Sequence, residues 1–264
     1  MGGYSTLLFE TRNNVAHITF NRPDAANGIN LELARDFSDA IRRSDEDPEI
    51  RAVLLSGNGK LFCAGGDLKA FAAQPPNDLP AYLREVTHFL HGAVATFARM
   101  SSPVIAAVHG SAAGAGFSLA CASDFVFAAE SAKFTMAYSR AGLTPDGSST
   151  YFLPRILGYR RALDMAITNP ILTAAQAHAL AIVTHVIPDA ELLERARAFA
   201  EQLATGPTLA FGGIKRLLLE AANNNLESQM ARETDWISQM ARTKDGREGI
   251  AAFVAKRPPK FHGE

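Results

Sequence analysis

Cysteine is scarce in this 264-residue chain, which has two, Cys63 and Cys121, each among small or apolar neighbours. Neither belongs to a Cys-x-x-Cys pair or to a Cys/His cluster, so we expect no disulfide framework and no metal site. Buried single thiols are typical of a protein in a reducing compartment. The cysteine usage therefore predicts a cytoplasmic location.

Strong charge and long apolar runs are missing as well. The formal net charge is −1, which gives no general attraction to nucleic acid or to an anionic membrane. No apolar run approaches the roughly 18 residues of a membrane-spanning helix. Residues 1–10 also lack the basic and then apolar pattern of a secretory signal. We expect neither a nucleic-acid partner nor a membrane partner.

Two runs of small residues are the most informative feature that is present, at residues 61–68 and 110–116. Neither continues as Gly-Lys-Ser/Thr, which excludes a Walker loop, and the second lacks the third small residue of the Rossmann fingerprint. Small residues let a bound molecule approach bare backbone. Two such loops, each after a strand, can hold one carbonyl oxygen between two N–H groups, as an oxyanion hole does. Close helix–strand packing is the alternative for either run alone.

The apolar pattern predicts alternating strands and helices. Strands are expected at 6–20 (a hairpin), 52–56, 104–108 and 125–127, and helices at 33–41, 83–97 and 114–122. The repeated order of strand, strand and helix favours stacked turns over an open Rossmann sheet. A proline-containing loop is expected around residues 69–80, and helices after about residue 148. Leu226, Met230, Ile237 and Met240 form a narrow apolar stripe that packs on the core or on another subunit.

Several ordered segments resemble the signature of the crotonase superfamily, the enoyl-CoA hydratases and isomerases. They are Asn-Arg-Pro-Asp-Ala-Ala-Asn (21–27), Phe-Cys-Ala-Gly-Gly-Asp-Leu (62–68) and Ala-Val-His-Gly-Ser-Ala-Ala-Gly-Ala-Gly (107–116). The resemblance continues through 142–147 and 153–155 to 256–259, and so covers essentially the whole chain. It implies an α/β fold, a spiral of ββα turns, with a core at 1–200 and a helical C-terminal trimerisation segment at 201–264. It also implies an acyl-CoA substrate, no cofactor beyond the coenzyme A of that substrate, and a homotrimer or a dimer of trimers.

The resemblance assigns roles to individual residues. The backbone N–H groups of Gly66 and Ala115 would be the oxyanion donors. Lys256 of a neighbouring subunit would approach the coenzyme A phosphates, with a solvated tail lysine as the alternative. The residues that would contact coenzyme A along its channel are Ala25, Ala64, Gly65, Gly66, Asp67 and Leu68.

Departures from the hydratase pattern reduce the number of reactions that the chain could catalyse. The two hydratase glutamates match Ser118 and Tyr138 in this chain, and hydration needs a pair of groups to activate water and deliver a proton. Asp146, in Pro-Asp-Gly, is the carboxylate that remains. This segment resembles that of the epoxyphenylacetyl-CoA isomerases of phenylacetate breakdown, where the aspartate is the acid/base. We predict isomerisation with Asp146 as the acid/base and Tyr138 as a hydrogen-bond donor in the substrate pocket.

Other interpretations stay open. Asp146 before a helix is also a common N-cap. Chlorobenzoyl-CoA dehalogenases of the superfamily use an aspartate here as nucleophile with a histidine to activate water; His88 and His91 are candidates, but these enzymes have tryptophan at the position of Tyr138. An enoyl-CoA hydratase, a hydrolase-like enzyme and a catalytically weak oligomeric binder of acyl-CoA are further alternatives.

Overall fold

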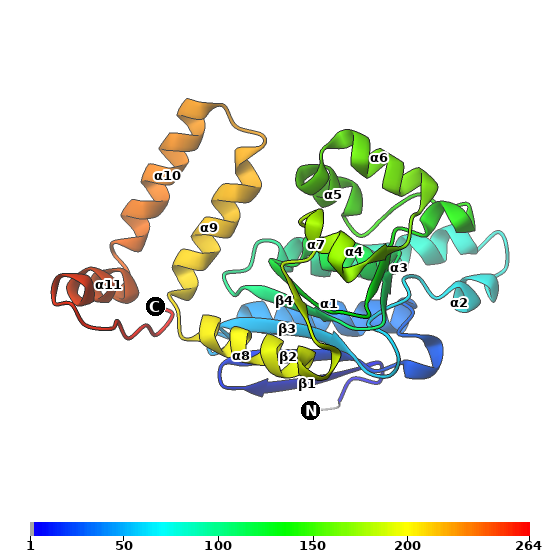
Figure 1. Cartoon of the computed structure of the whole chain (residues 1–264), viewed down its shortest axis with the longest axis horizontal. Coiled ribbons are helices and arrows are strands. Elements are labelled where there is room, and N and C mark those ends of the chain that lie inside the picture. The colour runs from blue at the N-terminus through cyan, green and yellow to red at the C-terminus, as the bar shows by residue number, and fades with distance from the viewer. Residues whose placement is uncertain (1–2) are drawn as a thin grey trace.

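Two β-sheets frame the structure, a computed structural model that describes residues 3–264 (Figure 1). Within these residues the larger sheet has six strands in the order β1-β2-β3-β4-β6-β9, and the smaller has three in the order β5-β7-β8. Neighbours in the larger sheet are parallel except for β1 and β2. The strands are β1 (Leu7–Arg12), β2 (Val15–Phe20), β3 (Ala52–Gly57), β4 (Val104–Val108), β5 (Ser111–Ala113), β6 (Phe125–Ala129), β7 (Lys133–Thr135), β8 (Leu172–Thr173) and β9 (His185–Ile187).

Helices cover both faces of the larger sheet (Figure 1). On one face, Phe37 of α1 contacts both Phe20 of β2 and Phe97 of α3, while α8 crosses the other face. The helices are α1 (Leu31–Glu46), α2 (Leu68–Ala72), α3 (Leu79–Phe97), α4 (Ala115–Ala122), α5 (Ser149–Leu157), α6 (Tyr159–Thr168), α7 (Ala174–Ala179), α8 (Leu192–Ala204), α9 (Thr208–Ala221), α10 (Leu226–Met240) and α11 (Lys244–Val254). Short 3₁₀ helices are η1 (Pro23–Ala25), η2 (Tyr138–Ala141) and η3 (Asp189–Glu191).

The first two strands form the predicted hairpin. They pair antiparallel, with Leu7 opposite Phe20. Asn13 and Asn14 connect them with φ angles of 51° and 59°. Such left-handed values suit a two-residue turn between twisted strands, and asparagine adopts them more readily than most residues.

The chain winds through both sheets in repeated turns. β4 leads into β5 and then α4, and β6 leads into β7 and then η2. Earlier turns reach the region of the smaller sheet through single bridges, from Cys63 to Ala112 and from Ile29 to Gly66. Each turn thus adds one strand to the larger sheet and one extended segment beside the smaller sheet. The structure confirms the predicted spiral of ββα turns.

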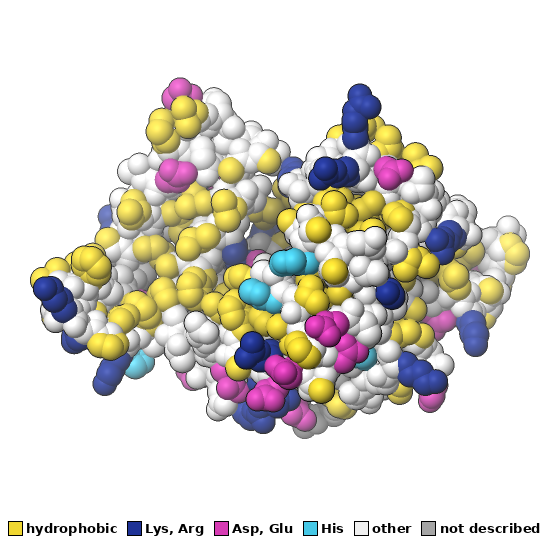
Figure 2. Space-filling model, viewed as in Figure 1, with side chains coloured by type: hydrophobic (Ala, Val, Ile, Leu, Met, Phe, Trp, Pro, Cys, Tyr) yellow, Lys and Arg dark blue, Asp and Glu magenta, His cyan; other side chains and the backbone are white. Residues whose placement is uncertain are grey.

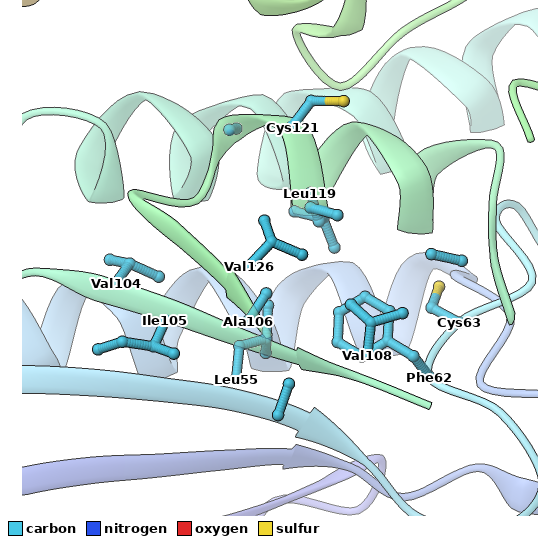
Figure 3. Packing of buried hydrophobic residues seen from close by; sticks show 14 of the residues in the cluster. Leu55, Phe62, Cys63, Val104, Ile105, Ala106, Val108, Leu119, Cys121 and Val126 are labelled. Carbon is cyan, nitrogen blue, oxygen red and sulfur yellow. The ribbon is translucent and has the colours of Figure 1, made fainter. Parts of the chain in front are cut away.

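The core lies between the larger sheet and the helices. Figure 3 shows buried side chains of β3, β4, β6 and α4, among them Leu55, Ile105, Val126 and Leu119, in one apolar cluster. Both cysteines are buried and unbridged, as predicted. Burial raises the pKa of the Cys63 thiol to about 12, so this cysteine stays a neutral packing residue.

The predicted loop at 69–80 is wrong at both ends. α2 occupies its start, because the Asp67 carboxylate accepts a hydrogen bond from the Ala70 N–H and caps the helix. At its other end Pro80 lies in the first turn of α3, where a proline's missing N–H has no helical acceptor to lose. The helices place this segment beside the small-residue loops.

The last three helices form an arm that stands away from the sheets (Figure 1). α10 packs back along α9, and Trp236 lies so close to Gly213 that a Cβ there would approach its ring to 2.9 Å. α8 runs to Ala204 and packs on the sheet, so the arm begins with α9. Over residues 3–264, none of the helices has the length and apolar character needed to cross a membrane.

Candidate active site

A cavity of about 250 Å³ lies between the two small-residue loops, α3 and the segment before α5. Gly66, Ala115, Tyr138 and Asp146 all border it, so the structure brings together the residues predicted for catalysis. Its remaining wall is mostly apolar and includes Ile29, Leu68, Phe71, Leu83, Val86, Leu90 and Leu143. Asp146 is the one acidic residue among the lining residues.

The two loops touch through their glycines. Gly65 has a φ of 99°, and a Cβ on it would lie 2.8 Å from the Ala113 carbonyl oxygen. A Cβ on Gly116 would lie 2.4 Å from the Cys63 carbonyl oxygen. Real Cβ atoms do not approach backbone so closely, so only glycine fits at either position. The two loops therefore lie in close contact, and this contact aligns them.

Two backbone N–H groups at this junction lack acceptors. Within residues 3–264, neither Gly66 nor Ala115 donates a backbone or side-chain hydrogen bond from its N–H, although Ile29, Gly65 and Asp67 around them are paired. Ala115 is the first residue of α4 and is 3% exposed. Buried N–H groups without partners are rare in proteins. Ala115 is buried and Gly66 is half-buried, and both line the same cavity, so their N–H groups are available to an acceptor there.

The Asp67 side chain stabilises the loop in which it lies. Besides capping α2, its carboxylate pairs with the Arg22 guanidinium at 2.9 Å. Burial opposes ionisation of this carboxyl, but the Ala70 N–H and Arg22 outweigh burial and lower its pKa. The loop is also tied to the first motif by the Ala64 N–H, which donates to Ala26 at 3.1 Å. Ala25 precedes Ala26 in the sequence and so lies close to this loop, but it does not line the cavity.

Ser118, Tyr138 and Asp146 form a hydrogen-bonded cluster. The Tyr138 hydroxyl lies 2.5 Å from Asp146 Oδ1 and 2.8 Å from the Ser118 hydroxyl. Ser118 is fully buried on α4. Burial raises the pKa of Tyr138, and the adjacent Asp146 carboxylate adds to the rise. Tyr138 therefore remains a protonated donor.

The Asp146 side chain does not cap a helix. The N-cap residue of α5 is Ser148, and no side chain caps that helix end. Only the backbone carbonyl of Asp146 contributes there, as acceptor from the Ser149 N–H at 3.2 Å. The carboxylate instead faces Tyr138 and the cavity, so the N-cap interpretation of its side chain is wrong.

The two candidate histidines take different positions. His88 is exposed on α3 and packs against Phe89. His91 Nε2 accepts a hydrogen bond from the Gly147 N–H at 3.2 Å. In this arrangement the Nε2 lone pair is occupied, so His91 holds the Asp146 segment and is not placed to activate a water there.

Lys256 lies outside this cavity. It is exposed at the end of α11, which Figure 1 shows on the opposite side of the molecule from α2 and α3. A single chain therefore does not bring Lys256 to the loop at 64–68. Two other cavities, of about 460 and 570 Å³, border α9. The first contains none of the predicted catalytic residues, and the second includes Asp146 but none of the others.

Two structural residues of the site were not assigned from sequence. Arg22 holds Asp67, and the Asn27 amide donates to the carbonyl oxygens of Asn58, Leu61 and Phe62. Asn27 is fully buried. Both residues stand in the first resemblance segment, and a polar side chain kept inside a motif between a strand and a helix is the signal that could have identified them.

Known proteins resemble this chain along nearly its whole length. The enoyl-CoA hydratase/isomerase family matches residues 10–264. The chain is 39% identical to a 1,2-epoxyphenylacetyl-CoA isomerase of Escherichia coli over 98% of each chain. It is 38% identical to a Rhodobacter capsulatus protein named "Probable enoyl-CoA hydratase", over 98% of this chain and 99% of that one. A crystal structure of an enoyl-CoA hydratase from Polaromonas superimposes with a TM-score of 0.89 at 35% identity, covering 97% and 99% of the two chains.

Proposed function

This chain belongs to the enoyl-CoA hydratase/isomerase family, and from that premise we propose that it isomerises a double bond, or an epoxide, of an acyl-CoA. One observation carries the proposal: a single carboxylate, Asp146, faces a cavity that also presents the unpaired N–H groups of Gly66 and Ala115. Coenzyme A arrives as part of the substrate, and the reaction needs no other cofactor.

The reaction uses these groups in sequence. The thioester oxygen accepts hydrogen bonds from the two N–H groups. Asp146 then removes a proton α or γ to the carbonyl, and the N–H groups hold the resulting enolate. Asp146 returns the proton to another carbon of the same conjugated system. A positioned general base contributes roughly 10²- to 10⁴-fold, and one oxyanion donor roughly 10²- to 10³-fold.

Hydration fits this cavity less well. It needs one group to activate water and another to protonate the second carbon. Ser118 and Tyr138 occupy the positions of the family's two glutamates, and both hydroxyls are bound within the cluster. Because the pKa of Tyr138 is raised by burial, its hydroxyl does not serve as a base. A single acid/base supports isomerisation in preference to hydration.

Asp146→Asn tests the proposal. Asparagine keeps the size of the side chain but removes the base, so folding and coenzyme A binding should be retained while turnover falls by roughly 10²-fold or more. Turnover is measured on 3-enoyl-CoA and aromatic-derived acyl-CoA substrates with product identification by mass. Asp164→Asn, which changes an exposed carboxylate on α6, serves as the matched control.

Two results would contradict the proposal. Asp146→Asn turning over at the wild-type rate would remove Asp146 from the chemistry. Efficient hydration of crotonyl-CoA by the wild type would favour a hydratase. Tight binding of acyl-CoA without turnover of any substrate would instead identify a catalytically weak binder, which would retain the same two N–H groups.

We also propose that residues 201–264 form an oligomerisation segment of a homotrimer or a dimer of trimers. The arm exposes large apolar side chains, among them Leu218 and Ile237 at 72% and Phe253 at 85%. Figure 2 shows hydrophobic side chains gathered on the face of this arm that borders the notch beside the rest of the molecule. In such an assembly Lys256 would reach the coenzyme A of a neighbouring subunit. We further propose that the protein is located in the cytoplasm.

A further inference from the structure

The cluster at Asp146 has a defined direction of hydrogen bonding. A carboxylate accepts hydrogen bonds and has none to donate. The Tyr138 hydroxyl, at 2.5 Å, must therefore give its single proton to Asp146 Oδ1. The Ser118 hydroxyl, 2.8 Å from the Tyr138 oxygen, can then donate to that oxygen, with the Asp146 and Gly114 carbonyls as alternative acceptors at 2.9 and 3.2 Å. The bond from Tyr138 to the carboxylate thus has one direction, and the Tyr138 oxygen is one of three acceptors within reach of the Ser118 hydroxyl.

The backbone holds the three residues in contact. Ala137 and Gly147 have left-handed φ angles of 58° each, and they precede Tyr138 and follow Asp146. A Cβ on Gly147 would lie 3.0 Å from Ser118 Cβ, so the Asp146 segment lies directly on α4. The Tyr138 carbonyl accepts from the Leu143 N–H at 3.2 Å, which turns the chain from η2 back toward Asp146.

We propose that Tyr138, supported by Ser118, is a positioning residue that aims Asp146 and stabilises its carboxylate form. Oδ1 is taken by the tyrosine, which leaves Oδ2 to receive the substrate proton. A hydrogen bond donated to a carboxylate favours the charged form over the acid. This inference rests on the proposed role of Asp146 as the acid/base and assigns the roles of the two residues at the glutamate positions.

The acidic side of the pH–rate profile reports this role directly. Tyr138 on η2 contacts Asp146, and His91 on α3 contacts the next residue, Gly147. Tyr151 on α5 and Arg99 line the 570 Å³ cavity that also includes Asp146. His91→Gln keeps an acceptor for the Gly147 N–H and does not titrate. A profile unchanged by His91→Gln assigns the acidic limb to Asp146.

The experiment measures exchange of the α-protons of phenylacetyl-CoA in deuterated water from low to neutral pH. Asp146 takes a proton from the α-carbon and a deuteron returns, so no net reaction is needed. For Tyr138→Phe we expect kcat to fall by on the order of 10-fold or more at unchanged KM. The acidic limb of its kcat/KM profile should move to higher pH, because the carboxylate has lost its donor.

Tyr4→Phe is the matched control. The Tyr4 hydroxyl donates to Asp39 Oδ2 at 2.7 Å, far from the cavity. Tyr4→Phe removes a hydrogen bond of the same kind, from a tyrosine hydroxyl to a carboxylate, and should leave kcat and the pH profile unchanged. A Tyr138→Phe profile that superimposes on the wild type would overturn the inference.

Ser118→Ala carries the test if Tyr138→Phe fails to fold. It should shift the same limb in the same direction by a smaller amount, and an unshifted limb would overturn the inference. Where both variants fold, the double variant should be no slower than Tyr138→Phe, because Ser118 acts through Tyr138. If the two substitutions instead lower the rate by independent factors that multiply, Ser118 does not act through Tyr138. Exchange by Asp146→Asn at the wild-type rate would reject the proposed function itself. Loss of exchange in Asp146→Asn with an unshifted Tyr138→Phe profile would reject this inference alone.

Discussion

Glycine at position 65 is required by two separate features, its φ of 99° and the Ala113 carbonyl 2.8 Å from where a Cβ would lie. Gly65→Ala must therefore shift the loop that carries the Gly66 N–H. A displacement of about 1 Å at a catalytic group can cost roughly 10²-fold in rate. We expect a loss of turnover of that order, measured as kcat on the acyl-CoA that the wild type processes best.

Gly158→Ala is the control for this variant. Gly158 also has a positive φ, of 79°, but a Cβ added there would meet no atom within 4 Å. With a ψ of 159°, Gly158 is in a region that only glycine adopts readily, so the substitution should cost about 1–3 kcal/mol through backbone strain alone. Equal losses of turnover in the two variants would show that the contact with Ala113 is not what positions the Gly66 N–H group.

The chemistry-bearing residues could be predicted one by one, but their contacts could not. Gly66, Ala115 and Asp146 stand in segments whose spacing is visible in the sequence, and the structure places all three at one cavity. The 2.5 Å contact between Tyr138 and Asp146 depends on left-handed backbone at Ala137. Alanine rarely adopts that conformation, so no propensity rule predicts the turn.

The stability of helix α2 depends on pH through its capping residue, Asp67. The pKa of Asp67 is lowered, because the Ala70 N–H and Arg22 outweigh its burial. A lowered carboxyl pKa stabilises the fold above the unfolded value of about 3.9, and this contribution is lost as pH falls through the lower folded value. Asp67→Ala should therefore cost about 1–2 kcal/mol at pH 7. Urea unfolding at pH 7 and in steps below pH 4 should show this difference shrinking; a constant difference would contradict it.

Helix α9 contacts the core through a half-buried lysine. Lys215 Nζ contacts Asp124 Oδ2 at 2.7 Å and the carbonyls of Phe97 and Ser102 at 2.9 and 3.1 Å. A hydrogen bond to a charged group typically contributes about 1.5–3 kcal/mol. We expect Lys215→Met to destabilise the protein by that order in urea unfolding.

A second substitution should restore part of this loss. In the native protein, Asp124 Oδ2 accepts a hydrogen bond from the Val104 N–H at 2.7 Å. In the double variant Lys215→Met/Asp124→Asn, the asparagine can still accept this hydrogen bond but carries no charge. The double variant should be more stable than Lys215→Met. Lys244→Met, which breaks an exposed pair with Glu264, should leave the urea midpoint nearly unchanged, because solvent screens such a pair. A double variant less stable than Lys215→Met would contradict the interpretation.

Elements with strong periodicity were predictable, and those set by tertiary contacts were not. The stripe on α3 and the alternation of β1 and β2 follow from local pattern. By contrast, β7, β8 and β9 have two or three residues each. Segments of this length are too short to show the alternation of apolar and polar residues that predicts a strand. α2 forms because Arg22, 45 positions away, helps hold its cap.

At the scale of the whole molecule, the arm of α9 to α11 leaves apolar surface that a monomer would expose to water. Ile237 of α10 is 72% exposed and Phe253 of α11 is 85% exposed. Contiguous apolar surface of this kind marks an interaction face. We expect the protein to sediment as a trimer or hexamer, and Ile237→Glu to shift it toward smaller species. A wild-type monomer at micromolar concentration would contradict the expectation.

The separation of Lys256 from the cavity of its own chain makes a sharper test. If Lys256 binds the coenzyme A phosphates of a neighbour, a site needs Asp146 from one subunit and Lys256 from another. Lys256→Ala alone should raise KM for acyl-CoA with little change in kcat, and Asp146→Asn alone should be inactive. Oligomers co-assembled from the two variants would contain some sites with both residues intact, so activity with wild-type KM should reappear on mixing. Mixed oligomers that retain only the raised KM of Lys256→Ala would show that Lys256 serves its own chain or no site at all.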